Sequence, residues 1–247
     1  MDLGLTGTLA IVTGASKGIG AATAKVLAQN GCDLILVSRT AEDLERLAEQ
    51  ITATTGRSAI PFAADLSRTD EIIRVAEAGK EAGILINNAG AIPGGRLDEV
   101  DEANWRAAWD LKVFGYINLT REAFAAMKVR GSGVIVNVLG AAAQTRPPSY
   151  ICGVTGNAAL TAFTMSLGSD SHRHGIRVLG VSPGPVATER LLKLQGSIES
   201  NAEMPFGRVA TPEEIASAIA FLASPASAYT SGSVLVIDGG LSARAAS

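Results

Sequence analysis

Cysteine and aromatic residues are scarce in this chain, long hydrophobic runs are missing, and neither sign of charge dominates. Its two cysteines, Cys32 and Cys152, have no metal-ligand spacing, so we expect free thiols in a reducing compartment and no metal site. A net charge of −3 gives no basic surface for nucleic acid or for an anionic membrane. No apolar run approaches the ~20 residues that span a bilayer, and the first residues, MDLGLTGTLAI, lack the regions of a signal peptide. These absences predict a cytoplasmic protein that binds neither nucleic acid nor membrane.

Hydrophobic residues make up 47% of the chain, and they fall in short aliphatic runs that alternate with longer amphipathic stretches. Continuous apolar runs are typical of strands buried in a parallel sheet, and the stretches between them have helical periodicity. This alternation predicts an α/β fold with a single doubly wound parallel sheet, Rossmann-like, and helices on both faces. The expected strands, about seven by this pattern, lie at 9–12, 34–37, 58–62, 84–86, 134–136, 176–181 and 234–237.

No linker, repeat or low-complexity tract divides the chain, so we expect one dinucleotide-binding domain over residues 1–247. The segment 189–205 lacks strong periodicity and is the expected substrate lid, with an apolar character. Thr40 and Thr211 are the expected N-caps of two helices, and Pro and Glu residues after Thr211 strengthen that second prediction.

A glycine-rich turn, TGASKGIG at 13–20, follows the first expected strand and precedes the first helical pattern. A strand that ends in such a turn brings backbone N–H groups and the positive end of a helix dipole to one point, which suits phosphate. The spacing G-x-x-x-G-x-G differs from the commonest dinucleotide fingerprint, and an ordinary strand–helix turn is the alternative interpretation. The residues expected to contact a cofactor here are Gly14, Ser16, Lys17, Gly18, Ile19 and Gly20.

The residue pair after the second strand indicates which dinucleotide binds. An acidic residue there accepts hydrogen bonds from the adenosine ribose of NAD, whereas an Arg accommodates the 2′-phosphate of NADP. This chain has Ser38 and Arg39 at that point, with Lys17 as a second cation in the glycine-rich turn. The sequence therefore predicts NADP, unless Arg39 is only a solvated loop charge. Two further expected cofactor contacts, Asp65 and Leu66, come after the third strand. Asp65 can accept from the adenine amino group or cap the next helix.

Two further segments are expected beside the cofactor because they follow strands of the same sheet. After the fourth strand, the amide of Asn87 can tie neighbouring strands together, and small residues let the backbone pass against a flat ring. After the sixth strand, Pro and Gly force a sharp turn, and Thr188 can hydrogen-bond a nicotinamide carboxamide. The cofactor contacts predicted in these segments are Asn88, Ala89, Gly90, Pro183, Gly184, Val186 and Thr188.

Several motifs together resemble the short-chain dehydrogenase/reductase family. TGASKGIG, NNAG, SPGPVAT, Gly207-Arg208 with PEEI at 212–215, and IDGG occur in the family's order, and the resemblance extends from about Leu5 to Leu241. It implies a nicotinamide dinucleotide and hydride transfer to or from a carbonyl or alcohol carbon of a small-molecule substrate. It also implies a homotetramer or homodimer that pairs through the helices near 112–129 and 150–172.

The chain departs from this family at four positions that usually carry catalysis. Local matches align Gly153 with the family's Tyr, Asn157 with its Lys, Gly140 with its Ser and Lys112 with its Asn. The ammonium and the amide have thus exchanged positions. Two glycines in place of Tyr and Ser imply an enlarged pocket that fits a bulkier or deeper ligand.

Lys112 and Tyr150 are the candidate catalytic residues that replace the usual groups. Lys112 can supply the missing ammonium near the ribose or act as an acid if burial lowers its pKa, or it can simply bind carbonyls between helices. Tyr150 precedes Gly153 by three residues and shares its helix face if the helix begins that early, or else it packs at a helix entrance. Cys152 and Thr155 are weaker candidates at the same place.

Three functions are compatible with this pattern. The first is an atypical NADP-dependent oxidoreductase, in which the cofactor supplies the hydride and the protein supplies position and a proton route. The second is a catalytically inactive NADP-binding scaffold or sensor, which the loss of the usual groups would explain. The third is non-redox, lyase-like chemistry in the vacated pocket. The intact cofactor motifs favour the first.

Overall fold

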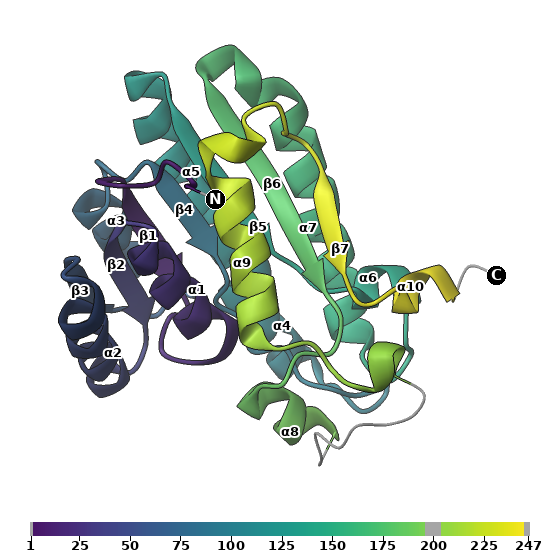
Figure 1. Ribbon diagram of the computed structural model, residues 1–247. Helices are drawn as coiled ribbons and strands as arrows, with labels where there is room; N and C mark the ends of the chain where they lie inside the picture. Colours follow the sequence, from purple (N-terminus) through teal and green to yellow (C-terminus); the bar gives the residue numbers. More distant parts are fainter. Residues whose placement is uncertain (1, 196–203, 245–247) are drawn as a thin grey trace.

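The computed structural model describes residues 2–195 and 204–244. Within them, seven parallel strands form one sheet in the order β3-β2-β1-β4-β5-β6-β7 (Figure 1). Helices cover both faces of this sheet, so the prediction of a doubly wound, Rossmann-like fold is confirmed. The strands are β1 (Leu9–Thr13), β2 (Asp33–Ser38), β3 (Ala59–Ala63), β4 (Ile84–Asn87), β5 (Gly133–Val138), β6 (Ile176–Pro183) and β7 (Val234–Ile237).

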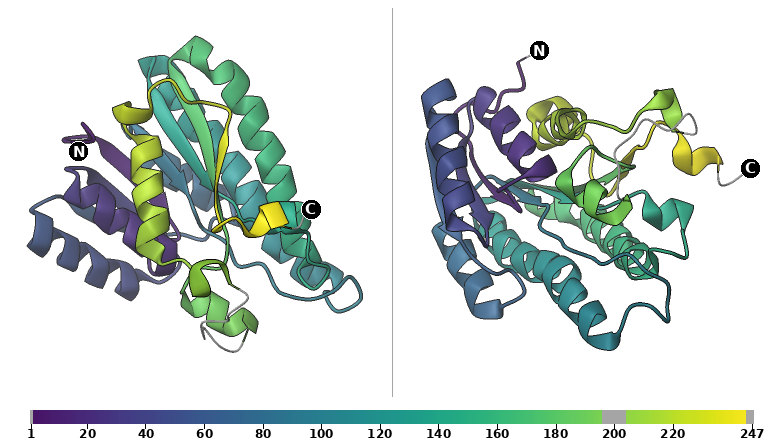
Figure 2. Two further views of the ribbon diagram at one scale, coloured as in Figure 1. Left: turned by 45° about the vertical axis from the view of Figure 1, so that its right-hand side comes forward. Right: turned by 90° about the horizontal axis from the view of Figure 1, so that it is seen from below.

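Two layers of helices sandwich the sheet (Figure 2). One layer contains α1 (Gly18–Gln29), α2 (Ala41–Thr55) and α9 (Pro212–Ala223), and the other contains α3 (Thr69–Ala78), α5 (Gly115–Arg130) and α7 (Ile151–Asp170). Shorter helical segments are α4 (Glu102–Trp109), a π-helical turn (Asp110–Phe114), α6 (Ala142–Thr145), α8 (Glu189–Gln195), α10 (Leu241–Arg244) and 3₁₀ turns at Ser171–His174, Pro205–Gly207 and Pro225–Ser227.

The alternation of side chains along each strand divides the apolar interior into two cores. Ala10 and Val12 of β1 pack with the layer of α1, α2 and α9, whereas Ile11 between them packs with α3 and α5. Successive strand residues point to opposite faces of a sheet, so both faces need apolar side chains. This explains why the strands are continuous aliphatic runs in the sequence.

The strand order reverses between β1 and β4, so the topological switch point of the sheet lies between these two strands. β1 pairs with β2 on one side and with β4 on the other. From β1 the sheet continues through β2 to β3, and from β4 it continues in the opposite direction through β5 to β7. Ligands of open α/β sheets bind at such a switch point. The glycine-rich turn after β1 and the NNAG segment after β4 therefore meet where a ligand is expected.

A chain of buried polar side chains ties the central strands to the helices beside them. Asn87 Nδ2 donates to Thr120 Oγ1 and to Asn137 Oδ1, each at 2.9 Å, and Asn137 Nδ2 donates to Thr164 Oγ1 at 2.9 Å. These bonds connect β4, α5, β5 and α7, because each residue belongs to a different element. Satisfied buried networks rigidify a core. The prediction that Asn87 ties neighbouring strands is confirmed.

The two predicted N-caps have different outcomes. Thr211 forms a complete capping box with Glu214, in which each side chain accepts from the other residue's backbone N–H. Thr40 occupies the N-cap position of α2, but its side chain makes no cap hydrogen bond with a described residue, so that part of the prediction is wrong. Glu42 and Asp43 in the first turn of α2 supply negative charge at the positive end of its dipole instead.

None of the described helices is long and apolar enough to cross a bilayer. Both cysteines are free and buried, and the described residues contain no cluster of three His, Cys, Asp or Glu side chains that can hold a metal ion.

Candidate active site

The first turn of α1 leaves its backbone N–H groups available to an anion. Lys17, at the N-cap, makes no side-chain cap with the described residues, and no acidic residue lies in the first turn. Gly18 has φ of +56°, and a Cβ there would come within 3.2 Å of Thr188 Cγ2. At Gly20 a Cβ would lie 2.1 Å from the carbonyl oxygen of Gly14. The turn therefore requires glycine at these positions, and it leaves the start of α1 uncapped, as the prediction of a phosphate site requires.

The segment after β4 braces this turn. The backbone N–H groups of Asn88 and Ala89 donate to Thr13 Oγ1 at 2.8 and 3.1 Å. The Asn88 amide donates to the carbonyl oxygens of Thr13 and Gly14 at 3.0 and 3.2 Å. The predicted residues Gly14, Asn88 and Ala89 thus lie together at the switch point.

Arg39 and Asp65 face the same region at the ends of β2 and β3. Burial alone would raise the pKa of Asp65, but hydrogen bonds from Ser67 and the charge of nearby Arg39 lower it overall. Asp65 Oδ1 accepts from the N–H and Oγ of Ser67, so it stabilises the turn before α3. The side chain of Leu66 is buried in the core, which leaves its backbone as the part that can face a ligand.

The predicted contacts after β6 lie across the glycine-rich turn from Asn88. Thr188 packs its methyl group against Gly18, and its hydroxyl donates to the Val186 carbonyl oxygen at 3.3 Å. Lys17 Nζ forms an exposed ion pair with Glu189 Oε2 at 2.9 Å, which links the glycine-rich turn to the start of α8. Pro183 and Val186 are buried, Gly184 is partly so, and Ser16 and Ile19 are half-buried.

Tyr150 fills the space beside Gly153. A Cβ on Gly153 would lie 2.0 Å from Tyr150 Cε1 and 2.1 Å from Cζ. Tyr150 is the N-cap residue of α7, which begins at Ile151. The helix therefore begins one residue too late for Tyr150 and Gly153 to share a helical face. The ring still folds back over the first turn and also packs near Trp105, Trp109 and Ile92.

Asn157 similarly fills the space beside Gly140. A Cβ on Gly140 would lie 2.8 Å from Asn157 Nδ2. The expectation of an enlarged pocket is therefore wrong, because Tyr150 and Asn157 occupy the volume next to the two glycines. Asn157 is 2% exposed, and its Oδ1 accepts no hydrogen bond from any described residue. Such an acceptor is costly unless a donor reaches it.

Lys112 lies in the π-helical turn between α4 and α5, and its stem runs along Gly90. Its Nζ donates to the Leu139 carbonyl oxygen at 3.3 Å and lies 6.0 Å from the ring centroid of Tyr116. Burial, together with the charge of Arg190, lowers the pKa of Lys112 to about 7. π-Helical turns inside longer helices occur often at functional sites.

Arg190 is the residue of this site that the sequence analysis missed. From α8 it donates to the carbonyl oxygens of Gly90 at 3.1 Å and Ile92 at 3.0 Å, and to Tyr150 Oη at 2.9 Å. It thereby connects the segment expected as a lid with Tyr150 and with Gly90, beside which Lys112 lies. The only signal in the sequence was a cation two residues after Thr188, in a segment interpreted as apolar.

The two weaker candidates have structural roles in the described part of the chain. Burial raises the pKa of the Cys152 thiol, which makes it a poor nucleophile. Thr155 Oγ1 donates to backbone carbonyl oxygens one turn earlier in α7, at Ile151 and Cys152. Neither feature supports a catalytic role for Cys152 or Thr155.

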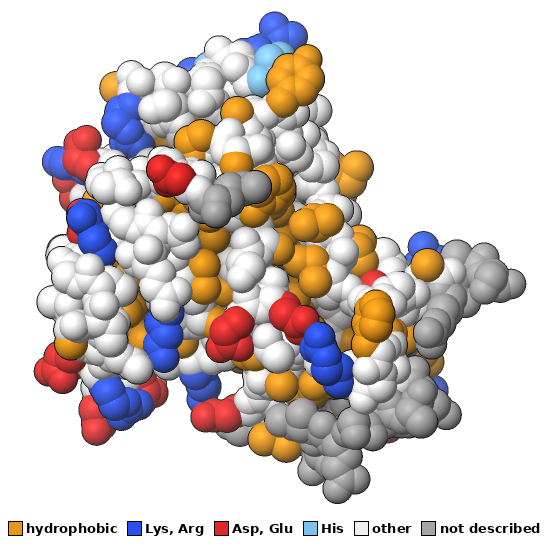
Figure 3. Space-filling model, viewed as in Figure 1, with side chains coloured by type: hydrophobic (Ala, Val, Ile, Leu, Met, Phe, Trp, Pro, Cys, Tyr) orange, Lys and Arg blue, Asp and Glu red, His pale blue; other side chains and the backbone are white. Residues whose placement is uncertain are grey.

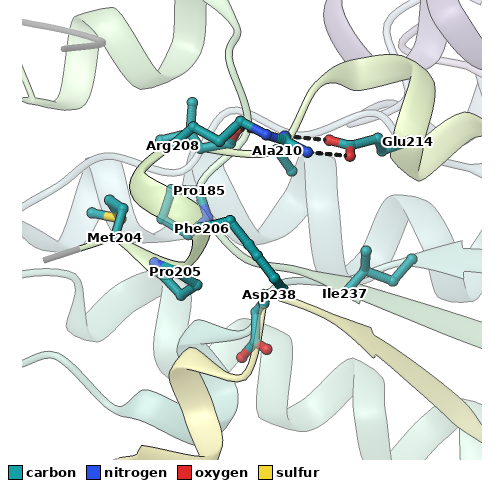
Figure 4. A pocket seen from close by; sticks show the side chains of 11 residues that line it. Pro185, Met204, Pro205, Phe206, Arg208, Ala210, Glu214, Ile237 and Asp238 are labelled. Atoms are coloured by element: carbon teal, nitrogen blue, oxygen red, sulfur yellow. Dashed lines mark hydrogen bonds and ion pairs between the residues drawn. The ribbon is translucent and has the colours of Figure 1, made fainter. Parts of the chain in front are cut away.

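A separate cavity of about 180 Å³ lies beyond the carboxyl ends of β6 and β7 (Figure 4). Pro185, Pro205 and Ile237 give it apolar walls, and Arg208 faces Glu214 across one side. That ion pair is bidentate, at 2.8 and 2.7 Å, and it lowers the pKa of Glu214 to about 2. The pair also belongs to the capping box of α9, so its primary effect is to fix this helix.

The doubly wound sheet with a glycine-rich turn at its switch point defines a Rossmann-like α/β protein. A family model described as enoyl-(acyl carrier protein) reductase matches residues 14–242. Galactitol 2-dehydrogenase (L-tagatose-forming) of Cereibacter sphaeroides is 36% identical over 96% of this chain and 95% of its own length. Cis-4-hydroxycyclohexanecarboxylate dehydrogenase of Sinomonas cyclohexanicum is 37% identical, over 95% and 96%.

A solved structure with a similar fold is L-sorbose reductase from Gluconobacter frateurii, complexed with NADPH and L-sorbose. It has a TM-score of 0.90 and 29% sequence identity, and the match covers 97% of this chain and 98% of that one. The chain belongs to the short-chain dehydrogenase/reductase family, and it is an oxidoreductase of that type.

Proposed function

We propose that this protein is an NADP-dependent oxidoreductase that transfers a hydride between nicotinamide and a small carbonyl or alcohol substrate. The observation that carries the proposal is the cluster of Lys112, Arg190 and Tyr150 around the Gly90 segment, next to the glycine-rich turn. Ionisable side chains that burial and a neighbouring charge perturb, as Lys112 is here, are typical of acid–base chemistry. The family relationship supplies the redox class.

The cofactor half of the proposal is supported by the uncapped N-terminus of α1 and by exposed Arg39 beside Asp65. The residues proposed to hold NADP are those predicted from the sequence, with the cradle at Gly14, Gly18 and Gly20. When bound, NADPH supplies the hydride and leaves the protein to supply a proton. Arg39 is proposed to pair with the 2′-phosphate, because no carboxylate follows β2 directly.

We further propose that Tyr150 and Lys112 replace the catalytic groups usual in the family. At the four aligned positions this chain has Gly140, Gly153, Asn157 and Lys112. The Tyr150 ring lies beside the Gly153 position, and the phenol oxygen accepts a hydrogen bond from Arg190. The Arg190 cation that donates to this phenol oxygen holds the hydroxyl in place, which is the position we propose for it in the reaction.

In the direction of reduction, the carbonyl carbon gains the hydride and the carbonyl oxygen gains a proton to become a hydroxyl. We propose that Tyr150 gives its phenolic proton to the carbonyl oxygen and that Lys112, with a pKa of about 7, is the second group of the site that exchanges protons at neutral pH. In the direction of oxidation, the same groups accept protons. The segment 189–205 is proposed to cover the substrate; of it, Glu189–Gln195 forms α8, and residues 196–203 lie outside the described residues.

Two measurements test this proposal. Calorimetric titration with NADPH and NADH measures cofactor binding, and we expect NADPH to bind more tightly. NADPH oxidation is then followed over a panel of aldehydes, ketones and oxo acids with wild type and with Lys112→Ala. Turnover by wild type that falls in the variant supports the proposal. Full activity in the variant removes Lys112 from the mechanism, and tight NADPH binding without any turnover identifies a scaffold or sensor instead.

We propose that the protein acts as a homo-oligomer, either a homodimer or a homotetramer. Hydrophobic side chains gather on the face that carries α9 and β7 (Figure 3), and Phe221, Leu235 and Val236 are exposed there. β7 is also an edge strand of the sheet. Phe114 and Met165 are exposed on the central helical segments expected to pair. Light scattering coupled to size exclusion tests this: a monomer mass at micromolar concentration contradicts it.

A further inference from the structure

The site holds two cations and no described carboxylate to balance them. Neither Lys112 nor Arg190 forms an ion pair with any acidic side chain of the described residues. Their hydrogen bonds go to backbone carbonyl oxygens and to the phenol of Tyr150. Partly buried charges usually occur in pairs, because removal from water is costly without a counter-charge.

The two cations also act on each other. The charge of Arg190 is one of the two causes that lower the pKa of Lys112 to about 7, and burial is the larger cause. The groups are held together through one residue, because Gly90 accepts from Arg190 and lies against the stem of Lys112. The titratable side chains that face Lys112 are Arg190 from α8 and Tyr116 from α5. A ligand that brings a negative charge would relieve this repulsion.

A second, independent observation indicates that this place awaits a polar ligand. Asn157, 2% exposed, has an Oδ1 atom with no donor among the described residues. Its amide lies beside Gly140, and Lys112 donates to the carbonyl oxygen of the preceding residue, Leu139. A buried acceptor of this kind needs a hydrogen-bond donor, which the hydroxyl of a hydroxy acid supplies and a carboxylate does not.

We infer that the substrate is an oxo acid or the corresponding hydroxy acid, whose carboxylate is held between Lys112 and Arg190. This inference rests on the proposed function and names its substrate class. The carboxylate offsets one of the two positive charges of the site, and it leaves Tyr150 as the group that faces the carbonyl oxygen. Arg190 has further N–H groups beyond its three hydrogen bonds, so a carboxylate does not have to displace Tyr150. The phosphate cradle at Gly18 is a different part of the site.

The test compares acids with neutral molecules of the same shape in a complex that cannot turn over. The protein is first saturated with NADP⁺, measured by calorimetry. It is then titrated with pyruvate, 4-oxopentanoate and 4-oxocyclohexanecarboxylate, each against its own carboxamide. We expect at least one acid to bind about 10- to 100-fold more tightly than its amide, as a charge-assisted contact requires.

Variants identify the groups responsible. Arg190→Gln and Lys112→Met should each bring the ratio of acid to amide affinity close to one. Arg173→Gln, which removes a cation from an exposed ion pair beyond the other end of α7, should leave the ratio unchanged. Circular dichroism of every variant checks that it is folded.

Three outcomes overturn the inference. Equal affinity of every acid and its amide, including no detectable binding of either, excludes a carboxylate site. An acid preference that persists in both variants places the anion elsewhere. Loss of NADP⁺ affinity in Arg190→Gln with an unchanged acid preference assigns this cation to a cofactor phosphate. Failure of wild type to bind NADP⁺ at all contradicts the proposed function itself, and is seen before any acid is added.

Discussion

The phenol ring of Tyr150 lies where a side chain on Gly153 would stand, with Cε1 only 2.0 Å from the position of a Cβ. One residue thus substitutes in space for another, three positions away in the sequence. Asn157 has the same relationship with Gly140. Each glycine therefore makes room for another side chain, from three positions away at Gly153 and from 17 positions away at Gly140.

Replacement of Tyr150 by Phe should lower the rate of turnover without loosening the fold. The ring and its packing are kept, but the hydroxyl that accepts from Arg190 is removed. We expect the rate to fall by about 10²- to 10⁴-fold, the usual contribution of a positioned acid. Steady-state kinetics measures the rate, and calorimetry with NADPH should give an unchanged affinity. A variant with wild-type turnover would show that the phenol proton is not used.

Addition of one methyl group at Gly153 should displace the ring. In Gly153→Ala the new Cβ overlaps Tyr150, so we expect a loss of about 1–3 kcal/mol in unfolding free energy from overpacking, together with reduced turnover. Gly156→Ala is the matched control on the same helix, because its Cβ would meet side chains no closer than 3.3 Å. Urea unfolding measures the stability of the two variants, and steady-state kinetics measures their turnover. If the two variants have equal stability, the Tyr150 ring does not occupy this space.

The pH dependence of stability tests the environment of Lys112. Burial and Arg190 lower its pKa from 10.5 to about 7, so the unfolded state binds more protons than the folded state between these values. Stability rises with pH wherever the unfolded state binds more protons. The loss of unfolding free energy that results from burial of the charged Lys112 is therefore largest below pH 7, and it decreases as the pH rises toward 10.5.

Wild type should accordingly gain stability relative to Lys112→Met between pH 7 and pH 10. Urea unfolding of both proteins at several pH values gives this difference. In the pH–rate profile, the rate of reduction should fall above a pH of about 7 as Lys112 loses its proton. The profile of Lys112→Met should lack this decrease. A stability difference that does not change with pH contradicts the buried-lysine description.

Arg39→Asp tests the preference for the cofactor. An aspartate in this position repels a 2′-phosphate and accepts hydrogen bonds from a ribose hydroxyl. We expect the affinity for NADPH to fall by about 10- to 100-fold, the value of a charge-assisted contact, and the affinity for NADH to rise. Arg121→Asp makes the same charge change on exposed α5 and serves as the control. Unchanged NADPH affinity in Arg39→Asp would make Arg39 a solvated loop charge.

The sheet could be predicted from the sequence because its physical cause is local. Each strand is buried on both faces, so aliphatic runs such as Leu34 to Val37 identify it without reference to its neighbours. The capping box of Thr211 and Glu214 is equally local, since both partners lie within one helical turn. The prediction of a capping hydrogen bond from Thr40 was wrong, because the type of residue indicates a cap position but does not determine where the hydroxyl points.

The candidate active site could be predicted only in part, because its contacts join residues that are distant in the sequence. Arg190 reaches Gly90 across 100 residues, and no periodicity indicates such a contact. The enlarged pocket was wrong for a related reason: a glycine in the sequence does not reveal which side chain takes the adjacent space. Tyr150 was found because its spacing from Gly153 is local, whereas the environment of Asn157 requires the packed structure.

Transfer of an isotope tests the central claim, that this chain moves a hydride between nicotinamide and a carbonyl carbon. The protein is incubated with NADPH that carries deuterium at C4 and with the panel of carbonyl compounds, and products are analysed by mass spectrometry. The account predicts an alcohol with one deuterium on the new carbinol carbon, formed by wild type and strongly reduced in Tyr150→Phe. NADPH bound at saturation with no deuterated alcohol from any member of the panel would contradict it.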